Sequence, residues 1–251
     1  TLGGVALLLI EVLPSAGSPW VPPLANKIAV VVDVFRATST MVTALANGCQ
    51  AIIPVLTTEE AVERRRTEKG AILAGERKAL KIEGFDLGNS PFEYTPEVVG
   101  GKKIIMTTTN GTRAIQAVAA AQCVWIASFL NAESIAQSIF KYLENNLNIE
   151  GIVIICAGSE DRFDIPDTLC AGMLIHRFGN GAELNDLGLA ASMLYNLTKG
   201  NILETLQETE HGRLLHSLGF ERDVVYCAQT NILPIVPVLK NGEIVWNMDN
   251  Y

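Results

Sequence analysis

An acidic residue and an arginine follow an apolar run in the stretch AVVVDVFRATST, residues 29–40. Asp33 comes directly after four apolar residues, and such a run is typical of a strand buried on both faces. Thr38 or Ser39 is a good N-cap for the helix expected to follow, and Arg36 lies in the turn before it. A carboxylate, a guanidinium and free backbone N–H groups together suit a metal-bound anion such as a phosphate ester. The alternative is structural: Asp33 caps the turn and Arg36 pairs with it.

Three further apolar runs end in similar turns. The strand predicted at residues 71–74 leads to Glu76, the strand at 103–107 to a small polar turn with an arginine, and the strand at 151–156 to a strongly acidic turn. The side chains in question are Glu76; Thr108, Asn110, Gly111 and Arg113; and Glu160, Asp161 and Asp167. Because turn chemistry alone does not demand both acids and arginines, this recurrence favours a shared site.

The order of these elements predicts the fold class. Strands and helices alternate through residue 178, which indicates a three-layer α/β/α fold around a mostly parallel sheet, with a mixed sheet as the alternative. In that fold the carboxyl ends of the strands lie at one edge, so the polar turns are expected to converge there. The irregular segment 78–101, with Asn89 and Ser90, is expected to form an ordered loop over this edge.

The remainder of the chain, residues 179–251, is expected to contain helices and then late strands at 224–228, 235–239 and 243–246, with a hairpin turn at 240–242. One α/β domain spanning 1–251 is predicted, with 179–251 as part of it or as a subdomain. The apolar helical faces within 188–218, with Leu194, Leu197 and Leu203 as exposed candidates, suit either a homodimer or helices that close the sheet.

Bulk composition excludes several classes of function. The 251 residues are 49% hydrophobic with a net charge of −8, and the one arginine run, Arg64 to Arg66, lies among glutamates, so no nucleic-acid partner is expected. The apolar run 5–10 is too short to span a membrane and is expected to be an edge strand or an N-terminal arm. Five scattered cysteines predict reduced thiols and a cytoplasmic location. Three poorly spaced histidines do not suggest a zinc site.

Four motifs in this order, DVFRATST, GFDLGNSP, TTTNGTRA and CAGSEDRFDIPDTLCAG, resemble the 2-phosphosulfolactate phosphatase family and cover residues 33–172. The resemblance implies Mg²⁺-dependent hydrolysis of 2-phospho-3-sulfolactate to 3-sulfolactate and phosphate, a step of coenzyme M biosynthesis. Similar proteins in bacteria that make no coenzyme M leave the physiological substrate open. In the family's fourth motif a Glu-Asp pair is expected; here Asp167 falls on the second acid and Pro166 replaces the first.

These arguments together assign roles to the side chains of the predicted edge. The catalytic candidates are Asp33, Arg36 and Asp167, and the Mg²⁺ ligand candidates are Asp33, Glu76, Glu160 and Asp167. The candidates for binding a small anionic phosphoester are Thr38, Ser39, Asn89, Ser90, Thr108, Asn110, Gly111 and Arg113. Attack by a metal-bound water is predicted, with Asp33 as nucleophile the alternative. The haloacid-dehalogenase mechanism lacks its general acid, because the residue two places after Asp33 is Phe35.

Two other functions fit parts of the pattern. Cys156, next to Ala157-Gly158 and close to a predicted helix N-terminus, could act as the nucleophile of an isochorismatase-like cysteine hydrolase with Asp33 as base. It could equally be a small apolar core residue. A non-catalytic sensor of an acidic phosphometabolite would use the same arginines and caps, but it would not line its pocket with three acids unless a metal neutralised them.

Overall fold

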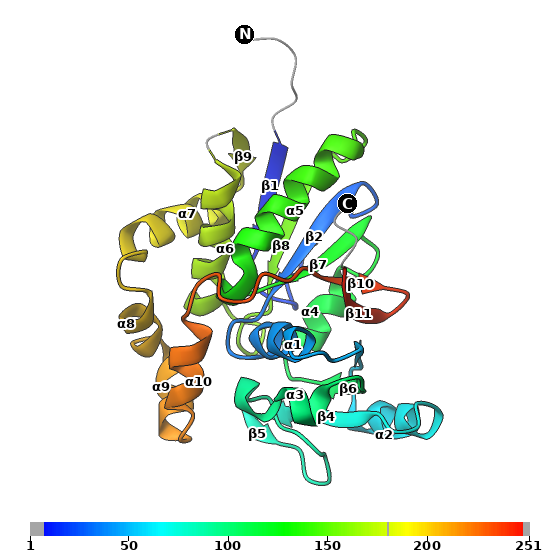
Figure 1. Ribbon diagram of the computed structural model, residues 1–251. Coiled ribbons are helices and arrows are strands. Elements are labelled where there is room, and N and C mark those ends of the chain that lie inside the picture. The colour runs from blue at the N-terminus through cyan, green and yellow to red at the C-terminus, as the bar shows by residue number, and fades with distance from the viewer. Residues whose placement is uncertain (1–7, 180, 248–251) are drawn as a thin grey trace.

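A computed structural model describes residues 8–179 and 181–247 of the chain (Figure 1). The strands are β1 (Leu8–Leu13), β2 (Lys27–Val32), β3 (Ala51–Pro54), β4 (Ile72–Arg77), β5 (Leu80–Lys81), β6 (Lys103–Thr107), β7 (Cys123–Ala127), β8 (Gly151–Cys156), β9 (Ala182–Leu184), β10 (Pro237–Lys240) and β11 (Glu243–Trp246). The α-helices are α1 (Ala37–Ala46), α2 (Thr58–Thr67), α3 (Pro96–Val99), α4 (Gly111–Ala117), α5 (Ala132–Asn145), α6 (Ile165–Phe178), α7 (Asp186–Thr198), α8 (Ile202–Gln207), α9 (Glu210–Ser217) and α10 (Glu221–Cys227). Short 3₁₀ helices cover Pro91–Glu93 and Phe129–Asn131.

The strands form one mostly parallel sheet, as predicted. Within the described residues its order is β5-β4-β6-β3-β11-β10-β7-β2-β8-β1-β9. Parallel pairs join β2 to β7 and β8, β1 to β8 and β9, and β6 to β3 and β4. The C-terminal hairpin β10–β11 is antiparallel and lies in the middle of the sheet, where it bridges β7 and β3 (Figure 1). The late strands therefore complete the sheet.

Two apolar layers cover the sheet, and they arise from the alternation of side chains along each strand. Ile28, Val30 and Val32 of β2 pack in one buried cluster with side chains of α5, α6 and α7. Ala29 and Val31 of the same strand pack in a second cluster with α1 and α4 on the other face. Because β2 is buried on both faces, its run KIAVVV has no polar alternation, and the three-layer α/β/α arrangement is confirmed.

Several predicted elements differ from the structure. The predicted strand 224–228 is wrong: residues 221–227 form helix α10, in which Val224 and Cys227 are buried three residues apart. The β-branched pair in DVVYC suggested a strand, but one buried face at helical spacing prevails. Strand β9 was not predicted. Helix α1 starts earlier than expected, at Ala37. Of the run 5–10, residues 5–7 lie outside the described part. Residues 8–10 belong to β1, which pairs with both β8 and β9 and is therefore neither the expected edge strand nor an arm.

The segment 78–101 is an ordered loop, as expected. It contains β5, the 3₁₀ turn at residues 91–93 and α3, and Tyr94 anchors it as a fully buried side chain whose hydroxyl donates to the Gly88 carbonyl oxygen at 2.7 Å. Thr40 of α1 also donates to the Asn89 carbonyl oxygen at 2.9 Å. The loop is thereby fixed against the helix that starts at the Asp33 turn.

Surface features of the described chain bear on two other expectations. None of its helices is both long and apolar enough to cross a membrane. The arginines Arg64, Arg65 and Arg66 all pair with nearby carboxylates, at 3.1, 3.0 and 2.5 Å. Of the apolar candidates on the later helices, Leu197 is 84% exposed, and a homodimer through that face stays a prediction.

Candidate active site

A cavity of about 340 Å³ opens at the carboxyl ends of the strands. It is bounded by the turns after β2, β4, β6 and β8, by Asn89 of the long loop and by helix α9. Figure 1 shows α8, α9 and α10 grouped at one corner of the molecule. The lining side chains are Asp33, Phe35, Arg36, Glu76, Arg77, Lys78, Ala79, Asn89, Thr109, Asn110, Ser159, Glu160, His211 and Leu214. Turns far apart in the sequence thus meet at one edge, as the parallel topology requires.

Asp33 lines this cavity and is held in place by the helix that follows it. Its Oδ1 accepts from the Ala37 N–H at 3.1 Å, and the Thr38 hydroxyl bonds its backbone N–H and C=O. Gly111 is required beside it, since a Cβ there would lie 2.7 Å from Asp33 Oδ2 and 2.5 Å from the Ala37 Cβ. Burial raises the pKa of the Asp33 carboxyl to about 7, against the opposing charge of His211.

Glu76 joins the turns after β4 and β6. Its buried carboxylate accepts from the Thr109 N–H at 2.7 Å and from the Ala79 N–H at 2.8 Å. Beside it, the side-chain oxygens Asn89 Oδ1, Thr109 Oγ1 and Asn110 Oδ1 are buried and have no hydrogen-bond partner in the described chain. Buried polar atoms are rarely left without a partner. The three residues that carry these oxygens all line one cavity, which suits a site for a polar ligand.

Arg36 lines the cavity but is already engaged. Its guanidinium is 2% exposed; Nη1 donates to Asp223 Oδ2 of α10 at 2.5 Å and Nη2 to the Ala79 carbonyl oxygen at 2.6 Å. The ring of Phe220 lies 4.1 Å from the guanidinium carbon, and Ser90 donates to the other Asp223 oxygen at 2.8 Å. The predicted phosphate clamp is therefore, in this structure, the centre of a buried network that includes Ser90.

The other acids predicted as metal ligands do not gather around Asp33. Both oxygens of Asp167 accept backbone N–H bonds, from Val34 at 2.8 Å and Gly158 at 3.0 Å, so this side chain ties the turns after β2 and β8 together. Glu160 lines the cavity but is largely exposed. Among the described residues, no group of three or more His, Cys, Asp or Glu is placed to hold a metal ion. The four predicted carboxylates therefore do not form one cluster.

Burial also affects the protonation of Asp167. Its pKa is raised well above the usual range, first by burial and then by the charges of Asp164 and Asp33. A carboxyl in this position is difficult to ionise without a nearby cation.

The predicted anion-binding residues divide into two groups. Asn89, Asn110 and Gly111 lie at the cavity or against Asp33. The rest make internal bonds or lie outside: the Ser39 hydroxyl donates to the Val34 carbonyl oxygen, and Thr108 Oγ1 accepts from the Thr112 N–H. Thr38 bonds the Asp33 backbone as described above, and the exposed Arg113 pairs with Asp161 at 3.0 Å.

Cys156 is unsuited to be a nucleophile. The residue is fully buried among the apolar side chains between the sheet and α6. Its pKa is raised well above the ordinary value, mainly by burial and also by Asp167, so the thiolate is disfavoured. The sequence suggested a lowered pKa from the nearby helix N-terminus, and desolvation outweighs that effect.

Replacing Cys156 by Ala tests this assignment. We expect the variant to keep ester hydrolysis within about threefold of the parent, with stability lowered by about 1 kcal/mol for the small cavity. Initial rates and a urea unfolding curve measure both. A folded variant without activity would show that Cys156 takes part in catalysis.

His211 of α9 is a site residue that the sequence did not reveal. It lines the cavity with Asp33, its Nδ1 lies 3.4 Å from Asp164 Oδ2, and its ring packs edge-on against Phe35 at 5.6 Å between centroids. A lone histidine in a helical segment outside the motifs carries no spacing signal. Only the fold brings it to the edge of the sheet.

Comparison with known proteins identifies the family of the chain. The family model described as 2-phosphosulpholactate phosphatase matches residues 21–242. A protein of Clostridium beijerinckii named "Probable 2-phosphosulfolactate phosphatase" is 42% identical over 240 residues, covering 94% of this chain and 98% of its own. Proteins of the same name from Symbiobacterium thermophilum and Clostridium acetobutylicum are each also 42% identical, covering 90% and 94% of this chain and 97% and 99% of their own. The chain belongs to the 2-phosphosulfolactate phosphatase family.

Proposed function

We propose that this protein is a Mg²⁺-dependent phosphate monoester hydrolase that converts 2-phospho-3-sulfolactate to 3-sulfolactate and phosphate. Family membership supports the reaction class and the substrate. One observation supports placing the reaction in this cavity. Asn89, Thr109 and Asn110, which line it with Asp33 and Glu76, each have a buried side-chain oxygen without a hydrogen-bond partner in the described chain. A step in coenzyme M biosynthesis is the role we infer for an organism that makes this cofactor.

The donor set fits Mg²⁺. All candidates are oxygens, and Mg²⁺ is usually held by one or two carboxylates together with waters and substrate phosphate. Asp33 and Glu76 would supply the carboxylates, and Asn89, Thr109 and Asn110 line the same cavity. Asp167, whose two oxygens accept backbone N–H bonds, and the exposed Glu160 are less suited as ligands. When bound, Mg²⁺ would neutralise the ester and polarise its phosphoryl oxygens.

The residues of the cavity would position the ester rather than perform much covalent chemistry. The amide groups of Asn89 and Asn110 would orient the phosphoryl oxygens. Asp33 lines the cavity and would accept the proton of the attacking water. Direct attack by water is our preferred route, and attack by the Asp33 carboxylate itself is the alternative.

Release of phosphate from a panel of phosphoesters tests the proposal. We expect turnover of 2-phospho-3-sulfolactate with Mg²⁺ and loss of more than about 100-fold in EDTA, because the buried carboxylates then repel the ester. The readout is inorganic phosphate, with Mg²⁺ added back to the chelated sample as the control.

The same assay separates the alternatives. Anion binding without turnover of any ester would favour a sensor. Turnover that survives EDTA but is abolished by iodoacetamide would favour the cysteine hydrolase. The buried position of Cys156 argues against the second outcome.

A cytoplasmic location is also part of the proposal. The cysteines form no disulfide within the described part of the chain, which suits a reducing compartment. The small anionic ester is the partner that we infer.

A further inference from the structure

Hydrolysis of an alkyl phosphoester requires a proton for the departing oxygen. The conjugate acid of an alkoxide is weak, so a positioned general acid accelerates departure by typically 10²–10⁴-fold. The arginine and the acid of the first motif are not the donors, since Arg36 is paired with Asp223 and Asp33 is assigned to accept the proton of the attacking water.

His211 occupies the position that this task needs. It lines the cavity from helix α9 and also borders a second cavity of about 680 Å³. Phe35 packs against its ring and Asp164 bonds its Nδ1. Nε2 is therefore the ring nitrogen that Asp164 does not engage.

The fold fixes this histidine rather than leaving it as a mobile surface group. Thr209 caps α9 by accepting from the Gly212 N–H at 2.9 Å. Gly212 packs so closely that a Cβ there would lie 2.0 Å from the Leu206 carbonyl oxygen. Asp164, the N-cap residue of α6, is itself buried. A carboxylate bonded to the far nitrogen of a histidine sets its orientation and favours its protonated form.

Resting on the function proposed above, we propose that His211, held by Asp164, is the general acid that protonates the leaving-group oxygen. Water oxygen bonds to phosphorus as the bond from phosphorus to the ester oxygen breaks. The electron pair stays on the ester oxygen, which takes the Nε2 proton and leaves as the alcohol. The proton that the water gives up passes to Asp33 and from there to solvent, and solvent returns a proton to His211.

The charges around His211 are consistent with this role. Burial lowers the pKa of His211, and the charge of Arg36 lowers it further. The hydrogen bond and charge of Asp164, together with the charge of Asp33, outweigh these effects, so the pKa is raised overall. Because the protonated form acts, kcat is expected to fall as the pH rises through this pKa.

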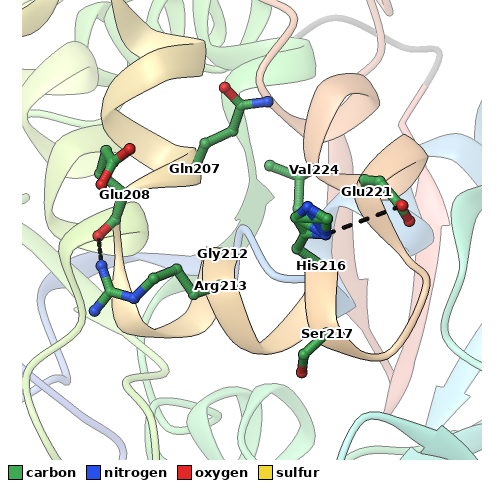
Figure 2. A pocket seen from close by; sticks show the side chains of 8 residues that line it. All are labelled: Gln207, Glu208, Gly212, Arg213, His216, Ser217, Glu221 and Val224. Carbon is green, nitrogen blue, oxygen red and sulfur yellow. Dashed lines mark hydrogen bonds and ion pairs between the residues drawn. The ribbon is translucent and has the colours of Figure 1, made fainter.

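His216 provides a matched control on the same helix. Its side chain is 71% exposed, lies near Glu221 and borders a different cavity, of about 480 Å³, shown in Figure 2. Figure 2 also shows Arg213 and Ser217 around this cavity, on the same helix as His216.

The experiment compares His211→Asn, Asp164→Asn and His216→Asn with the parent. We expect His211→Asn to lower kcat on 2-phospho-3-sulfolactate by about 100-fold or more, and to lower the rate on p-nitrophenyl phosphate less than about fivefold, because that leaving group needs no proton. Asp164→Asn should move the falling alkaline limb of kcat to lower pH, and His216→Asn should change nothing. Circular dichroism confirms folding.

Two results would overturn the assignment: equal losses on both esters in His211→Asn, or an unchanged alkaline limb in both His211→Asn and Asp164→Asn. If the parent does not cleave p-nitrophenyl phosphate, the alkaline limb of the pH profile of kcat is the deciding measurement. A parent that cleaves no phosphoester at all would instead refute the proposed function, which is a distinguishable outcome.

Discussion

Replacing Asp33 by Asn is expected to abolish ester hydrolysis while making the metal-free protein more stable above neutral pH. Asn keeps an oxygen that can accept from the Ala37 N–H, so the turn before α1 is preserved. It lacks the charge that the proposed ligand and base both need. We expect Mg²⁺-dependent turnover to fall by more than about 100-fold. A variant that keeps a near-parental rate would show that Asp33 has no role in catalysis.

The stability effect follows from the raised pKa of this carboxyl. Unfolded Asp33 ionises near pH 3.8 and folded Asp33 near 7, so between these values the folded state holds a proton that the unfolded state has lost. Parental stability therefore falls as the pH rises through this window, by up to about 1.4 kcal/mol per pH unit. Asp33→Asn does not lose this stability, because the Asn side chain does not ionise.

Urea unfolding in EDTA at pH 5 and pH 8 measures the difference. We expect the advantage of Asp33→Asn over the parent to grow by about 3 kcal/mol between the two. Excess Mg²⁺ should stabilise only the parent. An advantage that does not depend on pH would show that Asp33 is ionised throughout.

Residues predicted to share one edge of the sheet lie together where a local motif and the parallel topology both place them there. Asp33, Glu76, Asn89 and Asn110 each follow a strand or lie in a motif loop, and the cavity brings them together. Hydrophobic runs such as KIAVVV define buried strands regardless of what packs on them. The order of strands and turns along the sequence was therefore enough to predict which residues lie at the edge of the sheet.

What the sequence could not predict is which polar side chains would find partners. Asp223 lies in a helix that was expected to be a strand, yet its carboxylate satisfies Arg36 and Ser90. His211 depends in the same way on how α9 packs against the strand ends. Pairings between distant segments follow from tertiary packing, for which a single sequence carries no periodic signal.

Breaking the buried Arg36–Asp223 pair is expected to destabilise the protein strongly. Both side chains are at most 4% exposed, so Asp223→Ala leaves a buried guanidinium without its partner. Such changes cost about 3–5 kcal/mol. Urea unfolding of this variant measures the loss. The exposed pair of Arg66 with Glu63 is the control, and Glu63→Ala should produce no measurable change.

The double variant Arg36→Met with Asp223→Leu distinguishes a structural pair from a phosphate clamp. Replacing both charges by apolar groups removes the unpartnered ion, so stability should recover toward the parent compared with either single variant. If the guanidinium only joins α10 to the Asp33 turn, the KM of the double variant for 2-phospho-3-sulfolactate should stay within about threefold of the parental value. A rise of more than tenfold in KM in a stable double variant would mean that Arg36 leaves Asp223 to bind the ester. In that case α10 would have to release the arginine during turnover, because one guanidinium edge cannot serve both carboxylate and phosphate at once.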